Sequence, residues 1–279
     1  MKKNTRNTSF AHLKGTPPWD WPEDVGDTLR AVLDGDGSPV SDRFVAADFA
    51  GQLVAIDDDL VSILLRIAGS ATEPEELRVR AALSLGPVLE EAYSQGFEDP
   101  EELPISERTY DALVRRLRRL YLDAGVPATV RRRILEAAVR APQEWHRGAI
   151  RAAWASRDAK WRLTAAFCMR FVSGFDKEIV AALGSRRVDI RYEAIRAAGA
   201  WSVDAAWPRV AAIVEGERRH KPLLLAAIEA AAEIRPGQAG ELLADLAGSA
   251  DREIAAVADE ALVMAEGMRE ADEDYDDIW

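Results

Sequence analysis

The chain has 279 residues, of which 48% are apolar and 30% are charged, enough apolar material for a continuous core beneath a polar surface. Its formal net charge of −12 argues against non-specific binding to nucleic acid. A single cysteine, Cys168, excludes an internal disulfide framework and a cysteine-rich metal site.

Residues 1–24 are predicted to form a leader and an N-terminal cap segment. No apolar stretch follows the first lysines, so we expect no secretory signal. Trp19 and Trp21 stand among prolines, and we interpret them as a seal on the open end of the first repeat, with a recognition role as the alternative. The longest strongly apolar run, residues 60–65, falls far short of the roughly 20 residues that span a bilayer, so we expect no membrane partner and a cytoplasmic location.

Helices are predicted along the rest of the chain, because apolar residues recur at helical spacing and no segment alternates at period two. Acidic residues at 57–59 mark one helix start, and Pro74, Pro127 and Pro208 suit first-turn positions. After a first helix near residue 25, the predicted helices span residues 41–54, 58–68, 75–93, 107–123, 127–141, 145–156, 159–173, 176–183, 188–201, 204–215, 220–234, 238–247 and 251–266.

The domain organisation follows from these helices: residues 25–267 are predicted to form a single solenoid domain. It carries an insertion at about residues 92–108, which is either a functional element or tolerated surface length. Residues 268–279 form an acidic C-terminal tail, which such composition usually leaves disordered and solvated. The aromatic residues near its end leave a short docking motif as the alternative.

A nine-residue phrase recurs in the chain: an arginine, small or apolar residues three and four positions later, and in three copies a glycine eight positions later. Full copies begin at Arg43, Arg78 and Arg191, and the same frame without the glycine can be laid on Arg131, Arg162, Pro222 and Ala255. These starts lie 35, 53, 31, 29, 31 and 33 residues apart. A recurrence of roughly 30 to 40 residues is typical of solenoids, which usually offer a surface.

The phrase from Arg78 to Gly86 resembles the second helix of a HEAT repeat, in the short bacterial form also found in phycobilisome-lyase-like proteins. The resemblance covers about residues 40–265. It implies an all-α fold, an α-α superhelix of about six to seven helical hairpins whose second helices line a concave surface. It also implies that the arginines pair with acidic groups of neighbouring repeats, and the candidates for these groups are Asp42, Asp158, Asp189 and Asp251.

Catalytic constellations are hard to find in this sequence. His12, His146 and His220 are scattered and none is followed by glutamate, whereas the HEAT-repeat deoxyhypusine hydroxylases carry repeated His-Glu pairs as iron ligands. A glycine-rich phosphate loop is missing as well. We therefore expect a protein that is not an enzyme and that holds no cofactor and no metal.

Charge is unevenly distributed along the chain. Residues 107–170 contain fifteen basic and six acidic residues, a net charge of +9, so the rest of the chain carries −21. Nearly all these basic residues are arginine, which favours planar pairing with carboxylate or phosphate. Either this stretch faces a partner, or its arginines are solvated and pair with acidic groups of the chain itself.

The second, fifth and ninth positions after each phrase start are predicted to face the concave surface. The resulting candidate partner-binding residues are Arg80, Arg133, Glu136, Arg140, Phe167, Phe171, Glu193 and Arg196. An aromatic centre with charged flanks suits a protein partner more than nucleic acid. We therefore expect a non-enzymatic HEAT-repeat scaffold or adaptor that binds a protein partner through its concave surface.

The alternative function is binding of nucleic acid by the arginine-rich middle repeats, in a protein resembling the HEAT-like alkylpurine DNA glycosylases. Those enzymes place Trp, Asp and Arg on a basic concave face around the lesion. Trp154 and Asp158, one helical turn apart, are in keeping with that set. Thr164 stands where the arginine of that family is expected, which is a departure from the pattern.

Overall fold

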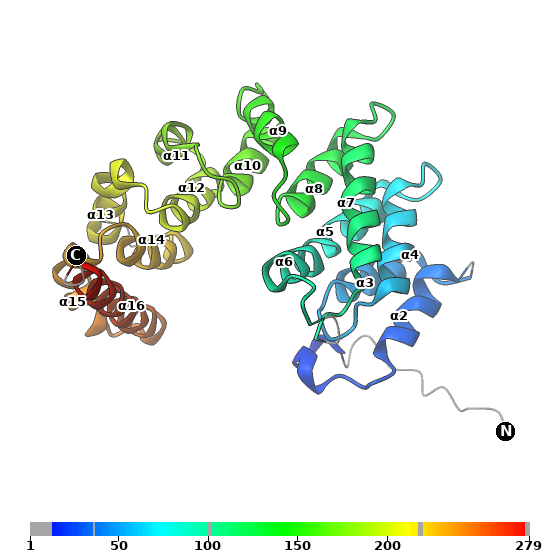
Figure 1. The fold of residues 1–279 in the computed structure, drawn as a ribbon, viewed down its shortest axis with the longest axis horizontal. Helices are drawn as coiled ribbons and strands as arrows, with labels where there is room; N and C mark the ends of the chain where they lie inside the picture. The colour runs from blue at the N-terminus through cyan, green and yellow to red at the C-terminus, as the bar shows by residue number, and fades with distance from the viewer. Residues whose placement is uncertain (1–12, 36, 100–101, 217–219, 277–279) are drawn as a thin grey trace. The chain divides into compact units, whose positions relative to one another are not determined.

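The computed structural model of the chain is built from helices (Figure 1). It describes residues 13–35, 37–99, 102–216 and 220–276, and no strand occurs among them. Contacts divide the chain into two compact units, residues 1–143 (unit 1) and residues 144–279 (unit 2). The predicted all-α fold, a succession of helical hairpins, is confirmed.

Unit 1 contains three helical hairpins among its described residues, and in each the two helices pack against each other. A short helix, α6 (Gly86–Gln95), is inserted before the third hairpin. The hairpins are α2 (Val25–Asp34) with α3 (Val40–Ala50), α4 (Asp58–Gly69) with α5 (Glu75–Ser84), and α7 (Glu107–Leu122) with α8 (Ala128–Ala138). The second helices α3, α5 and α8 pack in succession, so they form one continuous face of this unit.

Unit 2 contains four hairpins among its described residues. They are α9 (Glu144–Trp154) with α10 (Ala159–Cys168), α11 (Asp176–Leu183) with α12 (Val188–Ala200), α13 (Trp207–Gly216) with α14 (Lys221–Ile234), and α15 (Pro236–Ala247) with α16 (Arg252–Asp276). In Figure 1, α10, α12 and α14 follow one another along one side of the unit, and α9, α11 and α13 along the other. With three hairpins in unit 1, the expected six to seven hairpins are present.

Two predicted boundaries are wrong. The helix expected over residues 75–93 ends at Ser84 and restarts as α6, because Pro87 cannot donate the hydrogen bond that a continuous helix requires. At the other end of the chain, α16 continues to Asp276, where a disordered tail was expected from residue 268. Residues 1–12 of the predicted leader and the last three residues lie outside the described residues. The single solenoid domain over residues 25–267 stays a prediction.

The glycine of the repeated phrase marks the closest approach between neighbouring second helices. A Cβ added to Gly51 would lie 2.8 Å from the Cα of Ser84, and one added to Gly199 would lie 3.1 Å from the Cα of Ala230. Backbones this close leave no room for a side chain, since interiors are packed to near-crystalline density. The phrase therefore encodes the stacking of one hairpin on the next.

The arginine that opens the phrase secures the end of the preceding helix. Arg43 donates to the carbonyl oxygen of Leu33 at 3.1 Å, and Arg78, which is buried, donates to that of Ala68 at 3.1 Å. Each acceptor lies ten residues earlier, in the last turn of a helix. The last carbonyls of a helix have no partner within it, so these bonds satisfy groups that burial would otherwise leave unpaired.

Of the four aspartates suggested as partners of a neighbouring repeat, one plays that part among the described residues. Asp251 accepts from Lys221, 30 residues away, at 2.7 and 2.8 Å. Asp158 instead caps α10 by accepting from the backbone of Lys160, and Asp189 pairs with a nearby arginine. The remaining one, Asp42, accepts from the hydroxyl of the residue before it.

The two N-terminal tryptophans differ in role. Trp21 packs on Phe49 with a ring-centroid distance of 5.1 Å, and its indole nitrogen donates to the carbonyl of Thr16. Trp19 is 77% exposed and seals nothing in unit 1. Within the described part of the chain, no helix is both long and apolar enough to cross a membrane.

Candidate functional site

The eight residues predicted for the partner surface fall into two groups, one in each unit. Arg80, Arg133, Glu136 and Arg140 belong to α5, α8 and the residues just after α8 in unit 1. Phe167, Phe171, Glu193 and Arg196 belong to α10, the residues just after it, and α12 in unit 2. Each group is described within its own unit.

In unit 1, Arg80 is satisfied by its own neighbourhood. Its guanidinium pairs with Asp48 of α3 and with Glu76 one turn earlier on α5. It also lies over the ring of Phe44, 5.2 Å from the centroid. Because both hydrogen-bonding edges and one face of the guanidinium are engaged, little of Arg80 remains for a partner.

The other unit 1 candidates are likewise paired. Glu136 is only 6% exposed and forms ion pairs with Arg132 and Arg133. Arg140 pairs with Glu90 of α6. Arg133 and Arg140 of the basic stretch therefore pair with acidic residues of the chain itself.

In unit 2, the candidates form a surface that mixes aromatic and charged groups. Phe167 and Phe171 pack against each other with a centroid distance of 5.4 Å and are both partly exposed. The guanidinium of Arg170 lies over the ring of Phe171 at 5.6 Å. On the neighbouring helix α12, Arg196 lies over Tyr192 at 5.6 Å. Glu193, one turn before Arg196, is partly exposed on the same side of that helix.

Two carboxylates of α14 belong to this surface and were missed by the sequence analysis. Glu229 is exposed, and Glu233, one helical turn later, is partly buried. Burial raises the pKa of Glu233, the like charge of Glu229 raises it further, and Arg170 and Arg196 act in the opposite direction. These electrostatic interactions bring residues from α10, α12 and α14 together.

These carboxylates were not predicted because the copy of the phrase on α14 starts two residues later than the predicted start at Pro222. Glu233 lies where a Cβ on Gly199 would be, as Arg140 lies near a Cβ on Gly86. By this equivalence the copy on α14 begins at Leu224, and Glu229 and Glu233 become its fifth and ninth positions. The spacing from each glycine to the residue it meets on the next helix differs between copies, so this register follows from the spatial contact and not from the sequence.

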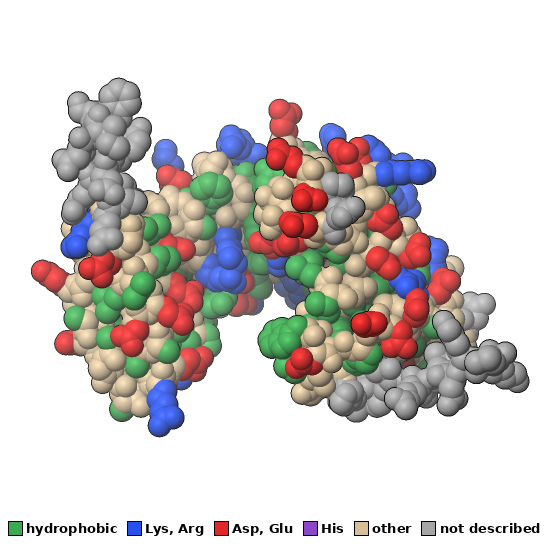
Figure 2. All heavy atoms as spheres, turned by 60° about the horizontal axis from the view of Figure 1, so that its bottom comes forward, with side chains coloured by type: hydrophobic (Ala, Val, Ile, Leu, Met, Phe, Trp, Pro, Cys, Tyr) green, Lys and Arg blue, Asp and Glu red, His purple; other side chains and the backbone are tan. Residues whose placement is uncertain are grey.

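We call the set formed by Phe167, Phe171, Arg170, Glu193, Arg196, Glu229 and Glu233 the unit 2 face. Its helices are held in register by Trp201, whose indole nitrogen donates to the carbonyl of Met169 at 2.8 Å and so ties the end of α12 to the end of α10. Figure 2 shows acidic side chains spread over the visible surface of unit 2, with apolar side chains between them. The unit 2 face likewise combines acidic and apolar side chains, together with two arginines.

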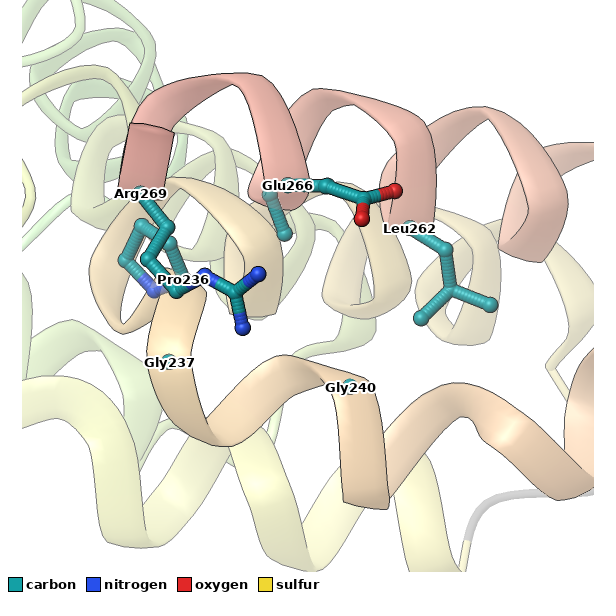
Figure 3. A pocket seen from close by; sticks show the side chains of 7 residues that line it. Pro236, Gly237, Gly240, Leu262, Glu266 and Arg269 are labelled. Atoms are coloured by element: carbon teal, nitrogen blue, oxygen red, sulfur yellow. The ribbon is translucent and has the colours of Figure 1, made fainter. Parts of the chain in front are cut away.

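A groove of about 220 Å³ also lies in unit 2, between α15 and α16. Figure 3 shows Pro236, Gly237 and Gly240 on one side, and Leu262, Glu266 and Arg269 on the other. Its charged groups are one exposed carboxylate and one exposed guanidinium. The groove therefore lacks the converging buried polar groups typical of a small-molecule site.

Residues with catalytic potential are few in the described part of the chain. His146 is buried against the ring of Trp145, and burial lowers its pKa to about 4. Cys168 is also buried. Among the described residues, no group of three His, Cys, Asp or Glu side chains is placed to hold a metal ion.

The residues suggested for a glycosylase-like site do not assemble one. The side chain of Asp158 is engaged in capping α10, where it accepts from the backbone of Lys160 at 2.8 Å. Thr164 is fully buried rather than on the surface. Asp158 therefore has a structural role, and these residues do not support a glycosylase-like site.

Comparisons with known proteins concern the fold. Neither a protein-family model nor a curated protein matches the chain. Human deoxyhypusine hydroxylase is 19% identical over 92% of this chain and 88% of its own, with a TM-score of 0.41. An engineered protein is 18% identical over 75% of this chain and 97% of its own, with a TM-score of 0.45. YibA of Escherichia coli is 15% identical over 91% and 94% of the two chains, with a TM-score of 0.46.

These comparisons correct one expectation. A structure matched over 92% of the chain is that of a hydroxylase, so the expectation of a non-enzymatic scaffold is contradicted. At 19% identity the likeness is one of fold, and no activity follows from it.

Proposed function

We propose that the unit 2 face recognises a polypeptide segment that carries a basic side chain beside an apolar one. The observation that carries the proposal is the position of two repelling carboxylates, Glu229 and Glu233, on the same face as the partly exposed aromatic pair Phe167 and Phe171. Recognition of this kind is independent of whether the bound polypeptide is a partner or a substrate.

The carboxylates supply the preference for a basic side chain. Like charges one helical turn apart destabilise a helix, and the raised pKa of Glu233 reflects that repulsion as well as burial. A lysine or arginine of a ligand placed between Glu229 and Glu233 would relieve the repulsion. Such a contact is charge-assisted and partly desolvated, which makes it stronger than a pair at an open surface.

The aromatic pair supplies the preference for an apolar neighbour. Phe167 and Phe171 expose ring surface that an aliphatic or aromatic side chain of a ligand would cover. Removal of apolar area from water contributes about 25 cal/mol per Å². Aromatic side chains with charged flanks are typical of the residues that dominate binding energy at protein interfaces.

Arg170 and Arg196 limit what the face accepts. They lie close enough to Glu233 to lower its pKa against the effect of burial, so the face is not a simple acidic patch. A ligand with a carboxylate beyond its basic residue would pair with them. A phosphate backbone would meet three carboxylates on this face, which is unfavourable.

The unit 1 candidates are left out of the proposed site, because Arg80, Arg133 and Arg140 already pair with acidic residues of their own unit. We also keep two expectations as proposals, a cytoplasmic location and a place among the short bacterial HEAT-repeat proteins. The repeated phrase supports the second of these.

The experiment is a fluorescence-anisotropy titration of the full chain with two sets of labelled octapeptides. One set places Arg or Lys beside Leu or Phe, and the other replaces the basic residue with Glu. We expect binding of the basic set, weakened roughly tenfold by a Glu229→Gln, Glu233→Gln double variant. Glu215→Gln with Glu241→Gln, two exposed sites of unit 2 outside the face, is the matched control. Equal affinity for both peptide sets would contradict the proposal.

A further inference from the structure

The solvent side of α7 is lined by arginines. Arg108, Arg115 and Arg119 are seven and four residues apart, so they follow one stripe along the helix. Arg116 and Arg118 flank this stripe, and all five side chains are exposed. The opposite side of α7 carries the buried Leu113, Leu117 and Leu120, which fix the orientation of the helix in unit 1. We call the five arginines the arginine face.

Most of the arginine face forms no ion pair in the described part of the chain. Arg115 pairs with Asp111 one turn earlier, at 3.3 Å. No carboxylate of the described residues pairs with Arg108, Arg116, Arg118 or Arg119. This distinguishes α7 from the second helices of unit 1, whose candidate arginines are paired.

The arginines of this face repel one another, and a ligand of opposite charge would relieve that repulsion. Arg115 lies three and four residues before Arg118 and Arg119, spacings at which like charges destabilise a helix. At the end of the stripe Leu122 is 65% exposed, beside the arginines rather than against the core. A complementary ligand would therefore present carboxylates followed by an apolar group.

The C-terminal segment of this chain has that composition. Six of the last ten residues are acidic, and the segment ends with Ile278 and Trp279. Arginine pairs with carboxylates through two parallel hydrogen bonds, which gives such a contact direction as well as charge. We propose that the arginine face of one copy of the protein binds the acidic C-terminal segment, residues 270–279, of a second copy.

The proposed contact is head-to-tail, because each copy offers one arginine face and one acidic segment. Such a contact is heterologous, so it either closes into a ring of copies or continues as an open chain, and in both cases association increases with concentration. It is independent of the unit 2 face, since it uses neither the residues nor the helices of that face.

The effect of salt on self-association distinguishes a contact between complementary charges from the general repulsion between two copies. Two copies that each carry a net charge of −12 repel each other, and low salt strengthens that repulsion. A contact between the arginine face and the acidic segment is attractive, and low salt strengthens it as well. Association that increases when salt is removed is therefore expected only if complementary patches meet.

The test is sedimentation equilibrium of the full chain over a range of concentrations at about 30 mM and about 300 mM salt. We expect a mean mass that rises with concentration and rises further at low salt. The double variant Arg115→Glu, Arg119→Glu, which reverses two charges of the arginine face, is expected to weaken association roughly tenfold or more. The matched control, Arg157→Glu with Arg186→Glu, changes two exposed arginines of unit 2 by the same charge.

Charge exchange gives the decisive comparison. The double variant Asp272→Lys, Asp274→Lys, which reverses two charges of the acidic segment, is expected to abolish association by itself. A chain that combines these substitutions with Arg115→Glu and Arg119→Glu is expected to regain association. Circular dichroism of each variant establishes that the helices are kept. A monomeric wild-type chain at low salt would overturn the proposal, and so would association that survives both separate reversals. Failure of the combined variant to regain association would also overturn it.

A labelled oligonucleotide tests the other polyanionic occupant. Binding of the oligonucleotide that depends on the arginine face, together with a monomeric wild-type chain, would assign that face to nucleic acid and overturn the proposal. The octapeptide titration of the unit 2 face is unaffected by either result, so the two proposals fail separately.

Discussion

Gly51 and Ser84 bring the backbones of two neighbouring repeats into contact. A Cβ added to Gly51 would lie 2.8 Å from the Cα of Ser84 and 2.9 Å from its carbonyl oxygen. Ser84 is held there by a buried hydrogen bond from its hydroxyl to the carbonyl of Ala47, at 2.7 Å. Separation of the two backbones at this point would break the hydrogen bond between Ser84 and Ala47.

Gly51→Ala is therefore expected to destabilise unit 1 by about 1–3 kcal/mol, the usual cost of overpacking a close-packed site. Urea unfolding followed by circular dichroism measures the difference. Gly148→Ala is the control, because a Cβ at this helical glycine meets nothing within 4 Å. Alanine favours a helix by about 1 kcal/mol over glycine, so the control is expected to gain stability. Equal effects of the two substitutions would refute the packing explanation.

The ion pair between Arg43 and Glu73 is expected to stabilise unit 1 in a pH-dependent way. Arg43 donates two hydrogen bonds to Glu73, at 2.6 and 2.7 Å, and their side chains are 14% and 15% exposed. These bonds lower the pKa of Glu73, and burial opposes them. A carboxyl whose folded pKa is lowered stabilises the fold above its ordinary pKa, and this contribution is lost as pH falls through the folded pKa.

Glu73→Gln is therefore expected to cost about 1–3 kcal/mol at pH 7. The difference from wild type is expected to shrink as pH falls below about 4.5, the ordinary range of glutamate. Denaturant titrations at several pH values measure it. A difference that stays constant with pH would show that the substitution acts through packing rather than charge.

Buried His146 is expected to make the fold sensitive to mild acid. Its pKa is lowered to about 4 from 6.5 by burial, so the folded chain holds it neutral. A base with a lowered folded pKa stabilises the fold above its unfolded pKa, and this stability is lost as pH falls from about 6.5 towards about 4, at roughly 1.4 kcal/mol per pH unit.

Between pH 8 and pH 5 this residue is thus expected to remove about 2 kcal/mol of stability. His146→Leu abolishes the titration, so the wild type minus variant difference isolates it from the carboxylates. Parallel pH dependence of the two chains would contradict the prediction.

The like charge of Glu229 is expected to be measurable in the titration of Glu233. Burial, then Glu229, raises the pKa of Glu233. Glu229→Gln removes the repulsion and leaves the burial, so it is expected to lower that pKa towards its ordinary value without reaching it. Carboxyl-carbon NMR of the two chains tests this, and an unchanged pKa would mean that the two groups are not coupled.

The sequence predicts the architecture well, because the recurring phrase reports stacking directly. Glycines that repeat in the sequence lie where neighbouring backbones meet, as for Gly51 and Gly199. The break between α5 and α6 was not predicted, since an apolar pattern continues through Pro87 although the proline cannot continue the hydrogen bonding.

The candidate site was predicted in part. Phe167, Phe171, Glu193 and Arg196 do lie at partly exposed positions of α10, α12 and the residues between them. Glu229 and Glu233 escaped because the copy on α14 lacks both arginine and glycine, so only a spatial contact fixes its register. The ion pairs of the arginines were not predicted either. Arg140 pairs with Glu90, which lies 50 residues earlier in the sequence, and no local sequence pattern indicates such a pair.

The most direct test of the proposed function is an exchange of specificity at the unit 2 face. In the octapeptide titration, wild type is expected to prefer the basic–apolar set, and Glu229→Lys with Glu233→Lys is expected to prefer the set that carries Glu. Phe167→Ala is expected to weaken both preferences without reversing either. If the double variant keeps the wild-type preference, or if wild type binds neither set, the face does not recognise polypeptides in the way proposed.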